Sequence, residues 1–222
     1  MKPPDVQTLY ERLLRHFGAQ GWWPAETRFE VMVGAILTQR TVWRNADRVI
    51  ESLRGEDLMT PLSLAKVDPK RLEALVRPAG FYRQKAKRLI DLAQFIVKRF
   101  GGSLEALFDR PTGELRETLM SLPGVGRETA DSILLYAADK LVFPVDAYTR
   151  RVCSRLGLIE SEGVDYEELR SLFEDGLPRD LRVYGELRAL LVRLGKAYCR
   201  VKPRCKECPL VELCDFAREQ MV

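Results

Sequence analysis

A glycine-containing turn is the first feature of this sequence that could do chemistry. The stretch Leu122-Pro123-Gly124-Val125-Gly126 separates two segments with helical periodicity. Its glycines allow backbone N–H groups at the start of the following helix to approach an anion, which the helix dipole also favours. The turn therefore predicts a phosphate grip that is independent of base sequence. A plain tight connection between two helices uses the same residues, and this stretch alone leaves that reading open.

A lone carboxylate follows the turn. Asp146, in the sequence Phe143-Pro144-Val145-Asp146, stands at the head of a third helical segment. Simple N-capping explains an aspartate at this place. Capping and catalysis are compatible here, because a charged carboxylate that caps a helix can also stabilise a cationic sugar.

The C-terminal part of the chain contains four closely spaced cysteines, Cys199, Cys205, Cys208 and Cys214, and a fifth, Cys153, lies apart. Four thiols in so short a stretch of an intracellular protein indicate a metal centre rather than disulfides. So short a tail cannot bury a core, and metal binding would supply the missing cross-links. The spacing leaves zinc and an iron–sulfur cluster both open. Cys153 is expected to be a buried small apolar residue.

Length and charge limit the remaining possibilities. The 222 residues suffice for one domain or two small lobes, and the net charge is +4. Segments 82–88 and 196–206 are basic without any acid, which suggests a polyanionic partner, although a solvated helix face explains either run alone. No signal peptide or membrane span is expected, so we predict a soluble, cytoplasmic protein. A single histidine, His16, argues against a histidine-rich metal centre or a histidine-based catalytic system.

Almost every periodic segment is helical, and the fold class is predicted to be all-α, with around ten helices. Thr27–Glu30 has the pattern of a capping box, and the apolar run 31–37 predicts a central buried helix. Asp68-Pro69 predicts a helix start. Helices are expected at 113–121 and 127–139, on either side of the glycine turn.

These features in this order resemble the helix-hairpin-helix DNA glycosylases of the endonuclease III type. Segments 36–41 and 80–86 match that family's early helix-and-turn segment and its second DNA-contacting segment. The resemblance implies a two-lobed fold: a helical barrel lobe with the hairpin at 28–141, and a second helical lobe formed by 1–27 plus 142–222. It also implies a [4Fe–4S] cluster on the four C-terminal cysteines, with zinc as the alternative. The first cysteine gap is five residues, where the usual endonuclease III pattern has six.

Glu128 bears on the type of glycosylase. The bifunctional enzymes of the family carry a lysine at this position, which attacks the sugar and allows strand cleavage. The resemblance therefore implies a monofunctional enzyme in which Asp146 is catalytic and water is the nucleophile. Glu128, together with segments 21–24, 37–39 and 145–148, most resembles the 3-methyladenine DNA glycosylase branch.

The resemblance also assigns the residues that would meet DNA. An alkylated purine carries positive charge, so a flipped base would suit indole rings, each contributing about 0.5–2 kcal/mol of cation–π attraction. The base pocket would contain Trp23, Trp43 and Glu128. Gln39 and Phe81 hold the wedge positions, and Tyr82 and Lys85 would flank the DNA backbone. The hairpin contacts would come from Leu122, Gly124, Val125 and Gly126.

The resemblance thus implies a monomeric, nucleoid-associated repair enzyme that acts on damaged double-stranded DNA without membrane contact. Its expected substrates are alkylated purines, chiefly 3-methyladenine, with 7-methylguanine as a further candidate. Two alternatives remain: a bifunctional glycosylase/lyase for oxidised pyrimidines, and a non-catalytic helix-hairpin-helix module that only binds DNA.

Overall fold

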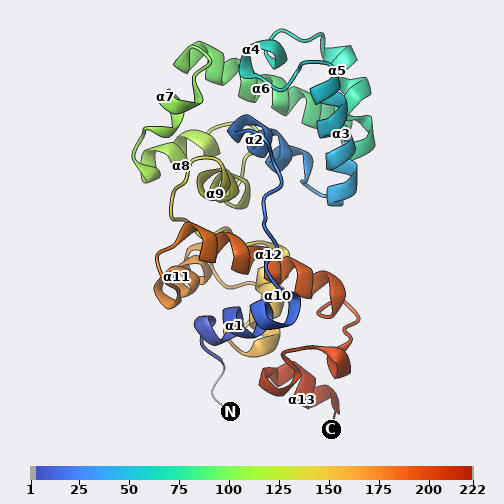
Figure 1. Cartoon of the computed structure of the whole chain (residues 1–222), viewed down its shortest axis with the longest axis vertical. Helices are drawn as coiled ribbons and strands as arrows, with labels where there is room; N and C mark the ends of the chain where they lie inside the picture. Colours follow the sequence, from blue (N-terminus) through green and yellow to red (C-terminus); the bar gives the residue numbers. More distant parts are fainter. Residues whose placement is uncertain (1–3, 222) are drawn as a thin grey trace. The chain divides into compact units, whose positions relative to one another are not determined.

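The computed structural model describes residues 4–221, and within them the chain is helical with no strand, as predicted (Figure 1). Thirteen α-helices and three short 3-10 helices occur in this range. The chain divides into two compact units: Ala25–Lys140, and the N-terminal segment up to Pro24 together with the chain from Leu141 onward. None of the helices in the described part is both long and apolar enough to cross a membrane.

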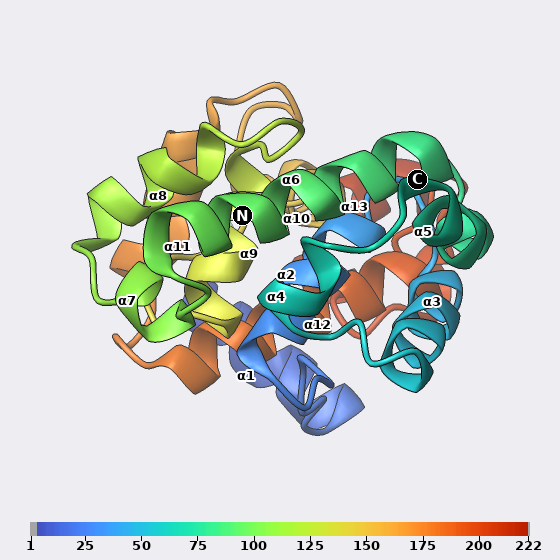
Figure 2. The ribbon, with the colours of Figure 1, turned by 90° about the horizontal axis from the view of Figure 1, so that it is seen from above.

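The unit Ala25–Lys140 is built around two helices, α2 (Arg28–Leu37) and α6 (Tyr82–Phe100). Helix α6 packs against α4 (Pro61–Leu64) and α5 (Pro69–Val76), and Figure 2 shows α6 running the length of this unit. The remaining elements are α3 (Trp43–Gly55), η1 (Arg77–Ala79), α7 (Leu104–Phe108), α8 (Thr112–Met120) and α9 (Arg127–Tyr136).

Helix α2 confirms the prediction of a central buried helix. Every residue from Phe29 to Leu37 is buried, and the helix packs against α3 and α9. Its N-cap is Thr27, whose side chain accepts a hydrogen bond from the Glu30 N–H at 3.1 Å. The reciprocal half of a capping box is replaced, because the Glu30 carboxylate instead accepts two 3.0 Å hydrogen bonds from Arg54 on α3. Glu30 therefore ties two helices together rather than closing its own cap.

Helix starts that depend on a local cap follow the sequence closely. Asp68 caps α5 through the Arg71 N–H at 2.8 Å, with Pro69 in the first turn, as predicted. Helix α9 ends at Tyr136, three residues before the predicted end.

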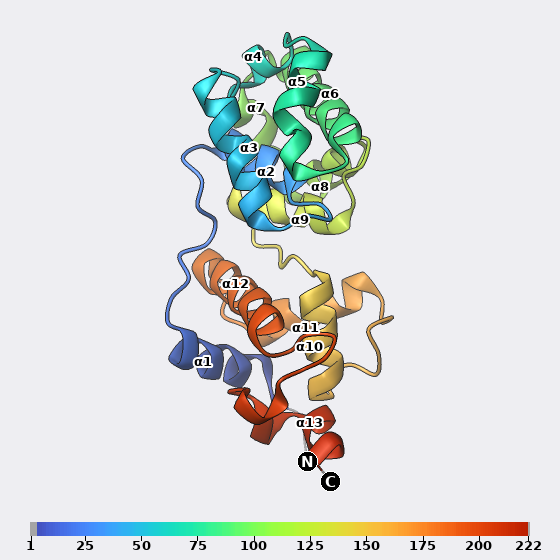
Figure 3. The same cartoon turned by 90° about the vertical axis from the view of Figure 1, so that its right-hand side faces the viewer.

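The second unit is built around α12 (Leu181–Ala197), which packs against α1 (Val6–Phe17) and α10 (Ala147–Leu156) (Figure 3). Helix α11 (Tyr166–Gly176) packs against α1. The C-terminal part forms two short 3-10 helices, η2 (Cys205–Glu207) and η3 (Val211–Leu213), and α13 (Asp215–Met221).

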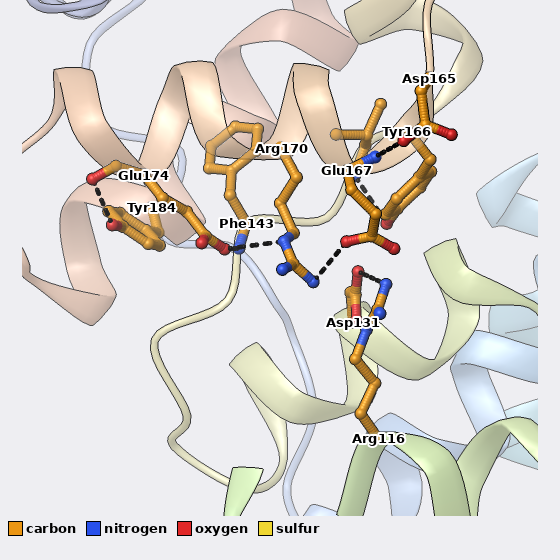
Figure 4. Close-up of polar contacts among 10 residues, drawn as sticks. Arg116, Asp131, Phe143, Asp165, Tyr166, Glu167, Arg170, Glu174 and Tyr184 are labelled. Atoms are coloured by element: carbon orange, nitrogen blue, oxygen red, sulfur yellow. Dashed lines mark hydrogen bonds and ion pairs between the residues drawn. The ribbon is translucent and has the colours of Figure 1, made fainter. Parts of the chain in front are cut away.

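The segment that leads into α10 is anchored on α11, as Figure 4 shows. The Phe143 N–H donates to Glu174 at 2.9 Å, and the Val145 N–H donates to the Tyr166 hydroxyl at 3.2 Å. The Phe143 ring stacks on Phe173 with ring centroids 4.2 Å apart. These contacts fix the backbone immediately before Asp146.

Candidate active site

The glycine turn joins α8 to α9 and forms the predicted helical hairpin. Gly124 has φ +77°, in the left-handed region, and Val125 donates its N–H to the Leu122 carbonyl at 3.1 Å. Gly126 is the N-cap of α9 and has no side chain with which to cap the helix. Leu122 and Val125 are buried while both glycines are exposed, so the backbone of the turn is the part that faces solvent. A phosphate fits such a helix terminus.

A buried ion pair supports the hairpin from inside. Arg116 on α8 donates to both carboxylate oxygens of Asp131 on α9, at 2.6 Å from Nε and 3.1 Å from the terminal nitrogen (Figure 4). The Asp131 side chain is fully buried. The two helices of the hairpin are therefore held by a bidentate pair in addition to their apolar contacts.

Gln39, predicted as a wedge residue, is tied to the hairpin. Its side-chain amide nitrogen donates to the Gly124 carbonyl at 2.9 Å and to the Thr129 hydroxyl at 3.1 Å. Its oxygen accepts from the Arg88 guanidinium at 2.5 Å. Arg88 lies across the turn so closely that a Cβ on Gly124 would be 2.1 Å from its Nε. Sequence reasoning did not find this link, because Arg88 appeared only as one charge in a basic run.

Phe81 and Tyr82 lie at the start of α6. Phe81 is 56% exposed and has φ +47°, so its ring is at the surface, where a wedge residue must be. Tyr82 is half-buried, and its ring lies 5.9 Å from the guanidinium of Arg77 and 5.6 Å from that of Arg83. Both positions are compatible with contacts to a nucleic acid.

Lys85 was predicted to flank the DNA backbone, but in the structure its side chain is buried. Its side chain is 1% exposed, and its ammonium donates 2.8 Å hydrogen bonds to the carbonyls of Leu37 and Ala79. Burial, and next the charge of Arg88, lowers the pKa of Lys85 to about 8. Lys85 lies one turn before the buried Leu89 on the same face of α6, and the packing of that face in the folded protein buries it. Lys85 thus bonds the C-terminal carbonyls of α2 and η1 rather than a surface partner.

The predicted pocket residues are divided between the two units. Trp43, at the first position of α3, is half-buried, and Glu128, at the second position of α9, is exposed; both belong to Ala25–Lys140. Trp23 belongs to the other unit, where it is half-buried with its ring 5.3 Å from that of Trp22. A pocket shared by these three residues stays a prediction.

Asp146 is the N-cap of α10, the role that its sequence context predicted. Its Oδ1 accepts from the Thr149 N–H at 2.8 Å and from the Thr149 hydroxyl at 3.0 Å. Its Oδ2 lies 3.4 Å from a terminal nitrogen of Arg188 on α12. The residue is 6% exposed. No pattern in the sequence indicates the pairing with Arg188.

Cys199 follows the end of α12, Cys205 and Cys208 lie at the two ends of η2, and Cys214 follows η3. Arg155 of α10 donates to the Cys199 sulfur at 3.4 Å, and the Cys214 thiol lies 3.2 Å from the Arg155 carbonyl. Burial, and to a smaller extent the charges of Cys199, Cys214 and Cys205, raise the pKa of Cys208 to about 11. Cys153 is fully buried, which confirms its predicted role in packing.

Comparison with known proteins identifies the class. The profile of the HhH-GPD superfamily base excision DNA repair proteins matches residues 33–179. A putative DNA repair glycosylase of Methanocaldococcus jannaschii is 50% identical over 210 residues, covering 94% of this chain and 95% of that protein. An endonuclease III of Thermotoga maritima is 33% identical over 193 residues, covering 86% and 84%.

Solved structures of similar proteins point to the same class. The 3-methyladenine DNA glycosylase (MagIII) of H. pylori, bound to 1,N6-ethenoadenine, is 33% identical with a TM-score of 0.74, covering 86% of this chain and 96% of that one. A trapped endonuclease III–DNA covalent intermediate has a TM-score of 0.82 at 24% identity, covering 98% and 97%, a likeness of fold alone. Fold and comparisons together define a DNA glycosylase. The chain belongs to the HhH-GPD superfamily of base excision DNA repair proteins.

Proposed function

We propose that this protein is a monofunctional DNA glycosylase that excises alkylated purines, chiefly 3-methyladenine, from double-stranded DNA. Glu128 at the second position of α9 carries the proposal, because α9 contains no lysine that could form a Schiff base with the sugar. The buried Lys85 is already bonded to two carbonyls. Water is then the nucleophile, and Asp146 stabilises the cationic sugar and orients that water.

The substrate class follows from charge. A purine methylated at N3 or N7 is cationic and leaves readily, so the enzyme needs no strong general acid. Trp23 and Trp43 offer electron-rich faces for such a base once it is flipped. The relatives support both an alkylpurine glycosylase and an endonuclease III-type enzyme. The H. pylori protein is named a 3-methyladenine DNA glycosylase and the T. maritima protein an endonuclease III, and each is 33% identical to this chain. Glu128 decides our choice between them.

For the DNA interface, we propose that the backbone of the hairpin turn binds a phosphate while Gln39 and Phe81 enter the duplex. Tyr82 would lie beside the backbone. The enzyme would act as a monomer on one lesion at a time. The exposed aromatic ring of Phe81 and the solvent-facing glycines of the turn support this assignment.

For the cysteine tail, we propose a [4Fe–4S] cluster held by Cys199, Cys205, Cys208 and Cys214. The donor set fits, since four thiolates are the usual ligands of such a cluster. Four cysteines also suit zinc, which is the alternative metal. The charges of the other three cysteines act on Cys208, as expected for four thiols that share one site. When bound, the cluster cross-links the tail to α12.

Two assays test the proposed reaction. Incubation with methylated duplex DNA is expected to release 3-methyladenine, and Asp146→Asn is expected to abolish this release. Borohydride treatment with abasic DNA is expected to trap no covalent adduct with the wild type. Glu128→Lys is the matched variant, since it restores the amine of the bifunctional enzymes and provides a positive control for trapping. An adduct with the wild-type protein would instead establish the bifunctional alternative.

A further inference from the structure

Helix α12 places a buried arginine against the candidate catalytic carboxylate. Arg188 lies in the middle of α12, and its guanidinium is 3.4 Å from Oδ2 of Asp146. The side chains are 11% and 7% exposed, respectively. We infer that Arg188 is a positioning residue, which fixes the orientation of the Asp146 carboxylate for base excision. This inference rests on the proposed role of Asp146.

The two oxygens of Asp146 are held by different elements. Oδ1 is fixed by two hydrogen bonds from Thr149, within the first turn of α10. Such bonds alone leave the carboxylate plane free to turn, because the last torsion of an aspartate is broad. Arg188 approaches Oδ2 from another helix, α12. The contact between Arg188 and Oδ2 therefore fixes the plane of the Asp146 carboxylate.

The distance and burial of the pair suit this role. At 3.4 Å the guanidinium is further away than in a direct hydrogen bond of about 2.7–3.2 Å. Oδ2 thus keeps capacity to accept a proton from water or to attract a cationic sugar. Because both groups are largely withdrawn from solvent, their attraction is stronger than that of a surface pair.

The same helix also anchors the segment that carries the predicted pocket tryptophans. Glu186 precedes Arg188 by two residues on α12, and its carboxylate accepts hydrogen bonds from the N–H groups of Gln20 and Gly21. The segment then continues into Trp22 and Trp23. Helix α12 therefore positions both the carboxylate and the tryptophan segment, which is what preorganisation of a site requires.

The test separates the rate of base release from DNA binding. Single-turnover release from methylated duplex DNA and the Kd for the same duplex are measured for Arg188→Gln and Arg188→Lys. We expect release by Arg188→Gln to be slower by about 100-fold, with Kd nearly unchanged, because a misplaced catalytic group costs rate rather than affinity. The rate of release by Arg188→Lys should fall between those of this variant and the wild type, since lysine keeps the positive charge but lacks the planar guanidinium with its several donors. Arg182→Gln, on the exposed first turn of α12, is the matched control and should keep the wild-type rate.

Each outcome is decisive. An unchanged rate in Arg188→Gln, with Asp146→Asn inactive, would overturn the inference while leaving the proposed function intact. A weaker Kd with an unchanged rate at saturating DNA would also overturn it, by making Arg188 a DNA contact. If Arg188→Gln does not fold, Arg188→Lys decides, and a wild-type rate for it counts against the inference. Full activity in Asp146→Asn would refute the proposed catalytic role itself.

Discussion

Gly124 is held by two independent constraints at the tip of the hairpin. Its φ of +77° is strained for any other residue, and a Cβ would lie 2.1 Å from the Arg88 side chain. Its carbonyl also accepts the hydrogen bond from Gln39. The turn, the proposed wedge residue Gln39 and the basic side chain of Arg88 therefore share one small cluster.

Gly124→Ala is expected to destabilise the protein by about 1–2 kcal/mol through the left-handed backbone alone, and to weaken DNA binding because Arg88 must move. Urea unfolding and the Kd for duplex DNA measure the two effects. Gly113→Ala is the matched control, since Gly113 lies in α8, with nothing within 4 Å of an added Cβ. It should be neutral or stabilising, as alanine favours a helix. Equal effects of the two substitutions would contradict this account of Gly124.

Lys85 links stability to pH. Its pKa is about 8 in the folded protein and about 10.4 in an unfolded chain. Between these values the unfolded state binds more protons, so Lys85 makes stability rise with pH from about 8 to about 10.4, by at most about 1.4 kcal/mol per pH unit. Below pH 8 both states are protonated and its contribution is constant.

Lys85→Met should remove this rise. Urea unfolding over the alkaline range gives the free energy of unfolding of the wild type and of the variant, and the titrations of other groups cancel in the difference between the two. If this difference in stability does not change with pH, the folded protein does not shift the pKa of Lys85. The variant should also be less stable at neutral pH, because the carbonyls of Leu37 and Ala79 lose their donor.

At the scale of elements, the hairpin is a helix pair fixed by a buried charge pair. We expect Asp131→Asn to destabilise the protein by about 3–5 kcal/mol, because the buried bidentate pair loses its negative charge. Glu114→Gln, in α8, removes an exposed partner of Arg110, which lies just before that helix, and should cost less than about 1 kcal/mol. Chemical denaturation measures the free energy of unfolding of both variants. Similar losses of stability would contradict the claim that the buried pair contributes more than the exposed one.

The sequence predicted most elements because their signals are local. The caps at Thr27, Asp68 and Asp146 each bond to the N–H three residues onward, so the sequence alone reveals them. Helix α2 was identified by its continuous apolar run. The Glu30–Arg54 pair was missed because its partners lie on different helices, and a capping box uses the same glutamate.

For the whole molecule, the cysteine tail is expected to depend on its cluster. Cys208→Ser should lose the visible absorption and bound iron of a [4Fe–4S] protein and lower the melting temperature, since metal binding contributes to folding. Cys153→Ala is the matched control: this residue is buried within α10 and should leave the iron content unchanged. Full iron in Cys208→Ser, or its loss in Cys153→Ala, would refute the ligand assignment. Zinc without iron in the wild type would establish the alternative metal.

The sequence by itself determined the helical class, the hairpin turn, the cap at Asp146 and the cysteine set, because each is written in neighbouring residues. Only the tertiary structure decided that Lys85 is buried, that Gln39 and Arg88 meet at Gly124, and that Arg188 faces Asp146. The physical reason is distance along the chain. A cap or an amphipathic face depends on positions three or four apart, whereas these contacts join residues that only helix packing brings together.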